Sequence, residues 1–208
     1  MQDKNAIVVI GYSGHAYVVS EILIEQGLSL DFYTDQKELT YNPYGLKYLG
    51  CETDRDFQGW ELDVAYALGI GNNRLREKAA QIVVDHEKSL QKVISNNSSI
   101  SKKAHIGNGV VISRGALVNA LAQVEDYAIL NTGCIIEHEC IVKRAAHIGP
   151  GAVLAGNVSV GRRTFVGANA VIKQGVKVGD DVVIGAGSVI INDVSNNSKI
   201  VGNPARMI

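Results

Sequence analysis

The length, composition and charge of this chain describe a globular protein of one or two domains. It has 208 residues, 46% of them hydrophobic and 20% charged, and twenty Lys and Arg against twenty-one Asp and Glu leave no basic excess for a nucleic-acid backbone. No apolar run approaches the roughly 20 residues that span a bilayer, and the run Ala6–Ile10 is too short for a signal peptide. We therefore expect a cytoplasmic protein with neither nucleic acid nor membrane as its partner.

The first part of the chain, residues 1–90, alternates strand and helix patterns. An apolar run over 6–10 and a Gly-rich turn precede apolar residues at helical spacing that end near Gly27. Further short apolar runs over 28–33 and 64–68 predict strands, and a helix is predicted from Arg74 to about Lys88. This order is a βαβ unit, so we expect a Rossmann-like α/β domain.

The turn after the first strand reads Gly11-Tyr12-Ser13-Gly14-His15. Free backbone N–H groups at such a turn can hold a diphosphate at the start of a helix. The same residues also fit a plain tight turn, and the third glycine of the dinucleotide fingerprint is missing. The motif leaves both interpretations open and argues against NAD or FAD.

The second part, residues 91–195, carries a repeat of six residues, and 196–208 form a C-terminal tail. Every sixth residue from Ile94 to Ile190 is Ile, Leu or Val, and a short residue lies four positions after each. A period of six cannot be an α-helix. It predicts a three-sided coil of short strands, about 18 residues per turn, with the aliphatic side chains stacked inside. Glycine after the aliphatic position suits corners with unusual backbone dihedrals; these glycines are Gly107, Gly149, Gly161, Gly167, Gly179 and Gly185.

One of the five histidines stands out on this repeat. His138 lies between Glu137 and Glu139 at an outward position of its hexad, where a carboxylate can orient the ring and let it take a proton near neutral pH. Glu137 and Glu139 also fit merely solvated charges, and Asn131 and Arg144 equally fit solvated surface residues without a role. His147, half a coil later, is a second candidate.

The cysteines do not point to chemistry. Cys134 and Cys140 occupy the inward small-residue position, which favours core thiols over nucleophiles. Three cysteines without a CxxC pair fit a reducing compartment and no disulfide framework. His105, His138 and His147 are not spaced by whole coils, so we expect no shared zinc site and no metal.

The chain resembles the bacterial N-acetyltransferases of nucleotide-linked amino sugars, including those of the bacillosamine pathway, with sialic acid O-acetyltransferases as relatives. The resemblance lies in six segments: Gly11-x-Ser13-Gly14-His15, Ile70-Gly71-Asn72-Asn73, Ile129-Leu130-Asn131-Thr132, Ile136-Glu137-His138-Glu139-Cys140, Ala155-Gly156-Asn157-Val158 and Gly202-Asn203-Pro204-Ala205. It implies an N-terminal sugar-nucleotide domain and an all-β left-handed parallel β-helix that forms a homotrimer, with acetyl-CoA in the groove between neighbouring helices.

The resemblance also implies roles for single residues. His138 corresponds to the general base and Glu139 to its electrostatic partner. The substrate-binding residues would be Ser13, Gly14, His15, Asp35, Gly71, Asn72 and Asn131, and the acetyl-CoA-binding residues would be His147, Gly156, Ala168 and Ala186. Thr34-Asp35 stands where some members carry two acidic residues, which makes the contact to the nucleoside the less secure part.

We therefore expect an acetyl-CoA-dependent N-acetyltransferase acting on the 4-amino group of a UDP-linked 4-amino-4,6-dideoxy-sugar. One alternative is a sugar O-acetyltransferase of the sialic acid type. Another is a non-catalytic scaffold that binds sugar nucleotides, but such a scaffold would be expected to have lost the His138 and Glu139 pair.

Overall fold

The computed structural model describes residues 6–208 and divides into two compact units. The first unit ends at Asn96 and the second runs from Asn97 to Ile208.

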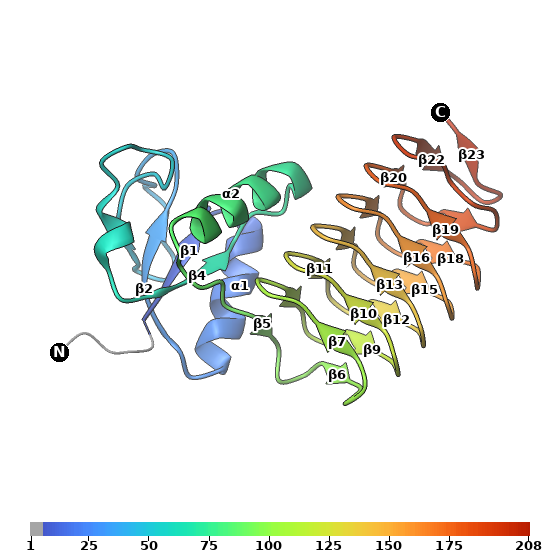
Figure 1. Ribbon diagram of the computed structural model, residues 1–208, viewed down its shortest axis with the longest axis horizontal. Helices are drawn as coiled ribbons and strands as arrows, with labels where there is room; N and C mark the ends of the chain where they lie inside the picture. The colour runs from blue at the N-terminus through green and yellow to red at the C-terminus, as the bar shows by residue number, and fades with distance from the viewer. Residues whose placement is uncertain (1–5) are drawn as a thin grey trace. The chain divides into compact units, whose positions relative to one another are not determined.

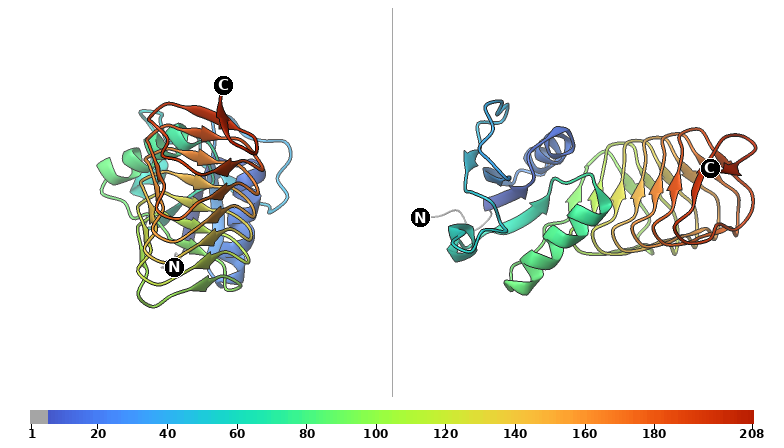
Figure 2. Two further views of the ribbon diagram at one scale, coloured as in Figure 1. Left: turned by 90° about the vertical axis from the view of Figure 1, so that its right-hand side faces the viewer. Right: turned by 90° about the horizontal axis from the view of Figure 1, so that it is seen from above.

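The first unit is built on a parallel sheet in the order β3-β2-β1-β4. The strands are β1 (Ala6–Ile10), β2 (Ser29–Thr34), β3 (Lys47–Tyr48) and β4 (Ala65–Leu68). All five residues of β1 are buried, as expected for an apolar central strand of a parallel sheet with both faces covered. Figure 2 shows the two helices, α1 (Gly14–Glu25) and α2 (Asn73–Asp85), on opposite sides of this sheet.

The predicted elements of this unit are confirmed, with small differences at their boundaries. Two short elements were not predicted: β3 and the 3-10 helix η1 (Gln58–Glu61). A last strand, β5 (Val93–Ile94), ends the unit. The chain returns from β1 to β2 on one side and to β4 on the other, so the strand order reverses beside β1. Such a reversal point is where open α/β sheets form a ligand crevice at the carboxyl ends of the strands.

The second unit is a left-handed parallel β-helix whose coils stack in Figure 1. Its first sheet contains β7 (His105–Ile106), β10 (Gln123–Val124), β13 (Ile141–Val142), β16 (Ser159–Val160) and β19 (Lys177–Val178). The second contains β8 (Val111–Ile112), β11 (Ile129–Leu130), β14 (His147–Ile148), β17 (Phe165–Val166), β20 (Val183–Ile184), β22 (Lys199–Val201) and β23 (Arg206–Met207). The third contains β6 (Ser99–Ile100), β9 (Leu117–Val118), β12 (Ile135–Ile136), β15 (Val153–Leu154), β18 (Val171–Ile172) and β21 (Val189–Ile190).

The pairing register confirms the predicted coil of three hexads. Ile129 pairs with His147, and His147 pairs with Phe165, so each residue pairs with the one three hexads later. The final coil is shorter than the others, because Val183 pairs with Lys199 and not with Val201.

The predicted aliphatic columns form the core of the β-helix. Every sixth residue from Ile112 to Ile190 is buried, as is every short residue of the second set from Val110 to Ser188. Ile100 and Ile106 are only half-buried, since the first coil has another coil on one side only. Burial of this continuous stack is the main stabilising term of a solenoid.

The corners have a regular backbone conformation that the sequence pattern did not reveal. One residue in each hexad from 109 to 187 has a positive φ, between +54° and +77°. These residues are Gly109, Gly115, Leu121, Tyr127, Gly133, Glu139, Ala145, Gly151, Asn157, Arg163, Asn169, Gly175, Asp181 and Gly187. The positive φ of Glu139 is therefore the ordinary corner conformation of this fold and not strain specific to a site.

The prediction that the glycines after the aliphatic positions supply unusual dihedrals was wrong. Their φ values lie outside the left-handed region, and their role is close approach to the next coil. A Cβ on Gly149 would lie 2.6 Å from the carbonyl oxygen of Val166, and one on Gly167 would lie 2.5 Å from the amide nitrogen of Ala186. Only glycine lets the backbones of successive coils come this close.

Candidate active site

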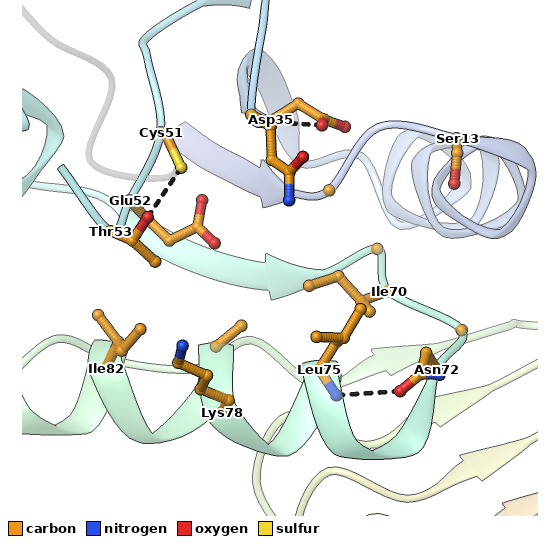
Figure 3. Close-up of a pocket in the computed structure, with 15 residues that line it drawn as sticks. Ser13, Asp35, Cys51, Glu52, Thr53, Ile70, Asn72, Leu75, Lys78 and Ile82 are labelled. Atoms are coloured by element: carbon orange, nitrogen blue, oxygen red, sulfur yellow. Dashed lines mark hydrogen bonds between the residues drawn. The ribbon is translucent and has the colours of Figure 1, made fainter.

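A cavity of about 450 Å³ opens at the carboxyl ends of β1, β2 and β4 in the first unit (Figure 3). Its lining combines the Gly-rich turn, the ends of β2 and β4, the segment after β3 and one face of α2. The lining residues are Gly11, Ser13, Asp35, Gln36, Cys51, Glu52, Thr53, Gly69, Ile70, Gly71, Asn72, Leu75, Lys78, Ala79 and Ile82. Four predicted substrate-binding residues, Ser13, Asp35, Gly71 and Asn72, are thus brought together around one cavity.

The turn between β1 and α1 forms one end of this cavity. Gly11 has φ +76°, and a Cβ there would lie 2.6 Å from Cγ1 of Ile70, so this position requires glycine. Ser13 is the N-cap residue of α1 and makes no side-chain capping bond, and Gly14 is the first residue of the helix. The helix therefore begins beside the cavity, where its N–H groups and positive dipole end favour an anion such as a diphosphate.

Two of the polar residues in the cavity also hold the local backbone. The Asp35 carboxylate accepts hydrogen bonds from the backbone N–H of Tyr12 at 2.9 Å and of Gln36 at 2.7 Å. The Asn72 side chain caps α2 by accepting from the backbone N–H groups of Arg74 and Leu75, both at 3.1 Å. These bonds fix where the remaining acceptor positions of Asp35 and Asn72 point.

His15 lies at the start of α1, with its Cβ 3.7 Å from the position a side chain on Gly71 would take. Burial, reinforced by the nearby Arg76 guanidinium, lowers the pKa of His15 to about 4, so the ring is neutral at neutral pH. Arg76 is completely buried and donates to the carbonyl oxygens of Ile70 and Gly71 at 3.3 and 3.0 Å. This arginine holds the loop between β4 and α2 in place.

On the β-helix, His138 and Glu139 lie on the corner that follows β12. His138 Nδ1 lies 3.1 Å from Glu139 Oε2. Because a carboxylate only accepts, Nδ1 carries the proton, and in the neutral ring Nε2 has the lone pair that a general base needs. The His138 side chain is 52% exposed, so the ring points outward from the coil.

Gly156 lies against the His138 ring from the next coil. A Cβ on Gly156 would lie 2.5 Å from Cε1 and 2.6 Å from Nε2 of His138. His138 and Gly156 occupy the same corner position of successive coils. The absence of a side chain on Gly156 thus provides the space that the Nε2 side of the His138 ring occupies.

Asn131 and His147 form a second pair on another part of the β-helix. Asn131 Oδ1 accepts from the backbone N–H of Thr132 at 2.8 Å, which orients the amide so that its Nδ2 donates to His147 Nε2 at 3.1 Å. His147 is consequently the neutral tautomer with its proton on Nδ1. The ring is 8% exposed and meets Phe165 edge-on, with 5.1 Å between ring centroids. The sequence singled out both residues but not their contact.

The predicted residues of the β-helix lie on two different corners of one chain. His138, Glu139 and Gly156 lie on the corner after β12 and β15. Asn131, Ala168 and Ala186 lie on the corner after β11, β17 and β20, and His147 lies on the adjoining strand β14. One β-helix does not bring the two sets together.

The cysteines of the β-helix are core thiols, as predicted. Cys134 and Cys140 are fully buried, and burial raises the pKa of Cys134 to about 12. Cys140 Sγ donates to the carbonyl oxygen of Ala155 at 3.1 Å. Over residues 6–208, no three His, Cys, Asp or Glu side chains gather as a metal ion would need.

Sequence reasoning missed the part of the cavity formed by Glu52, Thr53 and Lys78. Residues 36–61 carry no periodic pattern, and a single lysine on α2 gives no signal until the helix is placed beside the loop. Lys78, an outward residue of an amphipathic helix, is the only sign of this part of the cavity in the sequence.

Together, the two units define a class: an α/β unit with a nucleotide-type cavity, joined to a β-helix of the acyltransferase type with an outward histidine–carboxylate pair. The comparisons agree. Residues 6–83 match the PglD N-terminal domain, and residues 157–191 match the hexapeptide repeat of succinyl-transferase. No curated protein matches the chain.

Solved structures match almost the whole chain. PerB from Caulobacter crescentus, in complex with CoA and GDP-perosamine, is 34% identical, with 98% of this chain and 97% of that chain covered and a TM-score of 0.90. A histidine-to-alanine mutant of GDP-perosamine N-acetyl transferase from Caulobacter crescentus is 34% identical, covers 98% and 96%, and has a TM-score of 0.91. The acetyltransferase domain of PglB from Neisseria gonorrhoeae FA1090, in complex with acetyl coenzyme A, is 29% identical, covers 98% and 99%, and has a TM-score of 0.91.

The chain belongs to the hexapeptide-repeat sugar N-acetyltransferases, which use acetyl-CoA as the acetyl donor. This confirms the predicted family, fold and co-substrate. None of the helices within the described residues has the length and apolar character needed to cross a bilayer.

Proposed function

We propose that this enzyme transfers the acetyl group of acetyl-CoA to the 4-amino group of a 4-amino-4,6-dideoxy-sugar carried by a nucleoside diphosphate, with His138 as the general base. The observation that carries the proposal is the His138–Glu139 pair. It presents a half-exposed imidazole on a rigid corner, with Nδ1 bonded to a carboxylate, so that Nε2 is the nitrogen left to accept a proton.

The chemistry needs such a base. A sugar amine attacks only after it has lost its extra proton. Attack on the thioester carbonyl forms the C–N bond in a tetrahedral oxyanion, and the collapse of this intermediate breaks the C–S bond. His138 Nε2 would take the proton from the amine and return one to the departing CoA thiolate. Glu139 would stabilise the imidazolium formed in between, and backbone N–H groups would stabilise the oxyanion.

The first unit would hold the nucleotide in its cavity. The start of α1 suits the diphosphate, and Asp35 at the end of β2 occupies the position that binds the ribose in many α/β nucleotide folds. The resemblance implies UDP as the carrier, whereas PerB binds GDP-perosamine. Sugars linked to UDP and to GDP are therefore both to be tested as substrates.

A homotrimer would complete the site. The two sets of candidate residues lie on different corners of one β-helix, so a groove between neighbouring chains is needed to bring His138 of one chain near His147, Ala168 and Ala186 of another. The outer faces of two sheets also expose apolar side chains; these include Leu117, Val171, Phe165 and Val183. Because acetyl-CoA and sugar nucleotides are made in the cytoplasm, the enzyme would act there.

The proposal is tested by incubating the enzyme with acetyl-CoA and a panel of UDP- and GDP-linked 4-amino sugars and one sialic acid, with thiol release and product mass as readouts. An N-acetylated 4-amino sugar is expected. Acetylation of the sialic acid alone would favour an O-acetyltransferase, and nucleotide binding without thiol release would favour a scaffold.

His138→Ala tests the base. We expect kcat to fall by roughly 10²- to 10⁴-fold. His105→Ala, which changes an exposed histidine elsewhere on the β-helix, is the matched control and should keep wild-type activity. Near wild-type kcat for His138→Ala would remove this residue from the mechanism.

A further inference from the structure

The cavity of the first unit contains a carboxylate that the proposed mechanism leaves without a role. We infer that Glu52 reads the nucleobase of the bound nucleotide and selects guanine over uracil. This inference rests on the proposed role of the cavity as the nucleotide site and names the carrier more closely.

Glu52 is fixed in place by the strand beside it. Thr34, the last residue of β2, is completely buried, and its Oγ1 donates to Glu52 Oε2 at 2.8 Å. A charge-assisted bond from a buried hydroxyl restrains the position of the carboxylate. In Figure 3, Glu52 extends into the cavity from the segment after β3, and Lys78 extends toward the same space from α2.

The order of the sheet indicates which part of a nucleotide would reach Glu52. The start of α1 follows β1, Asp35 follows β2 and Glu52 follows β3, and these strands are neighbours in the order β1, β2, β3. A diphosphate at α1 and a ribose at Asp35 direct the base outward to Glu52. Ile82 lies at the Glu52 end of the cavity in Figure 3 and offers apolar surface for the face of a base.

The donor and acceptor pattern of the base decides between guanine and uracil. Guanine presents two adjacent donors, N1–H and the N2 amino group, which match the two oxygens of one carboxylate, and its O6 can accept from Lys78 Nζ. Uracil presents a single N–H between two carbonyl oxygens, so a carboxylate gains one bond and faces acceptor lone pairs on each side. Thr34 occupies one acceptor position of Oε2, and a carboxylate offers about four.

The test is calorimetric titration of the whole chain with GDP, IDP and UDP, without sugar or acetyl-CoA. IDP lacks only the 2-amino group of guanine. We expect GDP to bind at least about 10-fold more tightly than IDP or UDP, as for a charge-assisted hydrogen bond in a partly enclosed site. In Glu52→Gln, the three affinities should fall within about 3-fold of one another.

Glu61→Gln is the matched control, since Glu61 is an exposed carboxylate of the same unit outside the cavity, and it should keep the preference for GDP. Tighter binding of UDP than of GDP would overturn the inference and leave the proposed acetyl transfer intact. If Glu52→Gln lowered the affinities for GDP and UDP equally, Glu52 would contact the ribose and not the base, and this result would also overturn the inference. Binding of none of the three would overturn both the inference and the assignment of the cavity, while thiol release with an amino sugar would still report on acetyl transfer.

Discussion

The position of the His138 ring depends on one missing side chain. Since a Cβ on Gly156 would lie 2.5 Å from Cε1 of His138, Gly156→Ala must displace the ring without touching the core. A displacement of about 1 Å can lower a rate by about 100-fold, so we expect kcat to fall by roughly 10- to 100-fold. Steady-state kinetics measures this.

A double variant tests whether Gly156 affects kcat only through the His138 ring. In a His138→Ala chain, Gly156→Ala should have no further effect on kcat, because the group it displaces is gone. Additive losses in the double variant would show that Gly156 acts on something other than the ring.

His15 makes the stability of the first unit depend on pH. Its pKa is about 4 in the folded chain and near 6.5 in the unfolded chain, so between these values the unfolded state binds more protons. The free energy of unfolding therefore falls as the pH falls through this window, by up to about 3 kcal/mol. His15→Gln should remove that part of the slope in urea unfolding between pH 7 and pH 4.5. Equal slopes for His15→Gln and wild type would contradict the buried, neutral ring.

At the scale of the elements, the corner glycines hold successive coils together. Gly149→Ala would place a Cβ 2.6 Å from the Val166 oxygen and 2.9 Å from the Ala168 nitrogen, which are backbone atoms that cannot turn away. We expect a loss of about 1–3 kcal/mol in stability, as for other overpacked sites. Thermal unfolding measures it, with Gly156→Ala as the matched control, since that Cβ meets a movable side chain. A larger fall in Tm for Gly156→Ala than for Gly149→Ala would be the contrary result.

The elements differ in how far the sequence could define them. The hexads are visible because each contributes the same inward aliphatic residue, from Ile112 to Ile190, so a local pattern repeats without a break. The role of Gly149 and its equivalents was misjudged because the contact that requires glycine lies on the next coil, far along the chain. The strand β3 and helix η1 were missed because 36–61 has no period to read.

The same difference applies to the candidate site. His138 and Glu139 are neighbours in sequence, so their contact was predictable. Asn131 and His147 lie on successive coils and meet only because one coil stacks on the next. Glu52 and Lys78 lie on different elements of a sheet whose packing no local pattern encodes.

For the whole molecule, the proposed trimer depends on apolar side chains on the outside of the β-helix. Leu117 and Val171 belong to one sheet and are 41% and 40% exposed. We expect light scattering of the wild type to give three times the chain mass, and Leu117→Glu with Val171→Glu to shift it toward the monomer with loss of acetyl transfer. Lys177→Glu, on the more polar sheet of β19, is the control. A monomeric wild type that transfers acetyl groups would contradict the shared groove.

Each hexad from 109 to 187 turns one corner through a residue of positive φ, and three corners complete a coil. The number of hexads therefore determines which face of the β-helix each later side chain occupies, and this restricts how the β-helix can change in length. Three hexads inserted after Val160 would add a complete coil and return each later side chain to its former face. A single hexad inserted there would rotate all later corners by one face and carry Ala168 and Ala186 away from the line of Asn131. Shortened spacing occurs at the last coil of the described β-helix, where Val183 pairs with Lys199. Evolutionary growth or loss of this scaffold is therefore expected in whole coils, with departures from the period tolerated at its end.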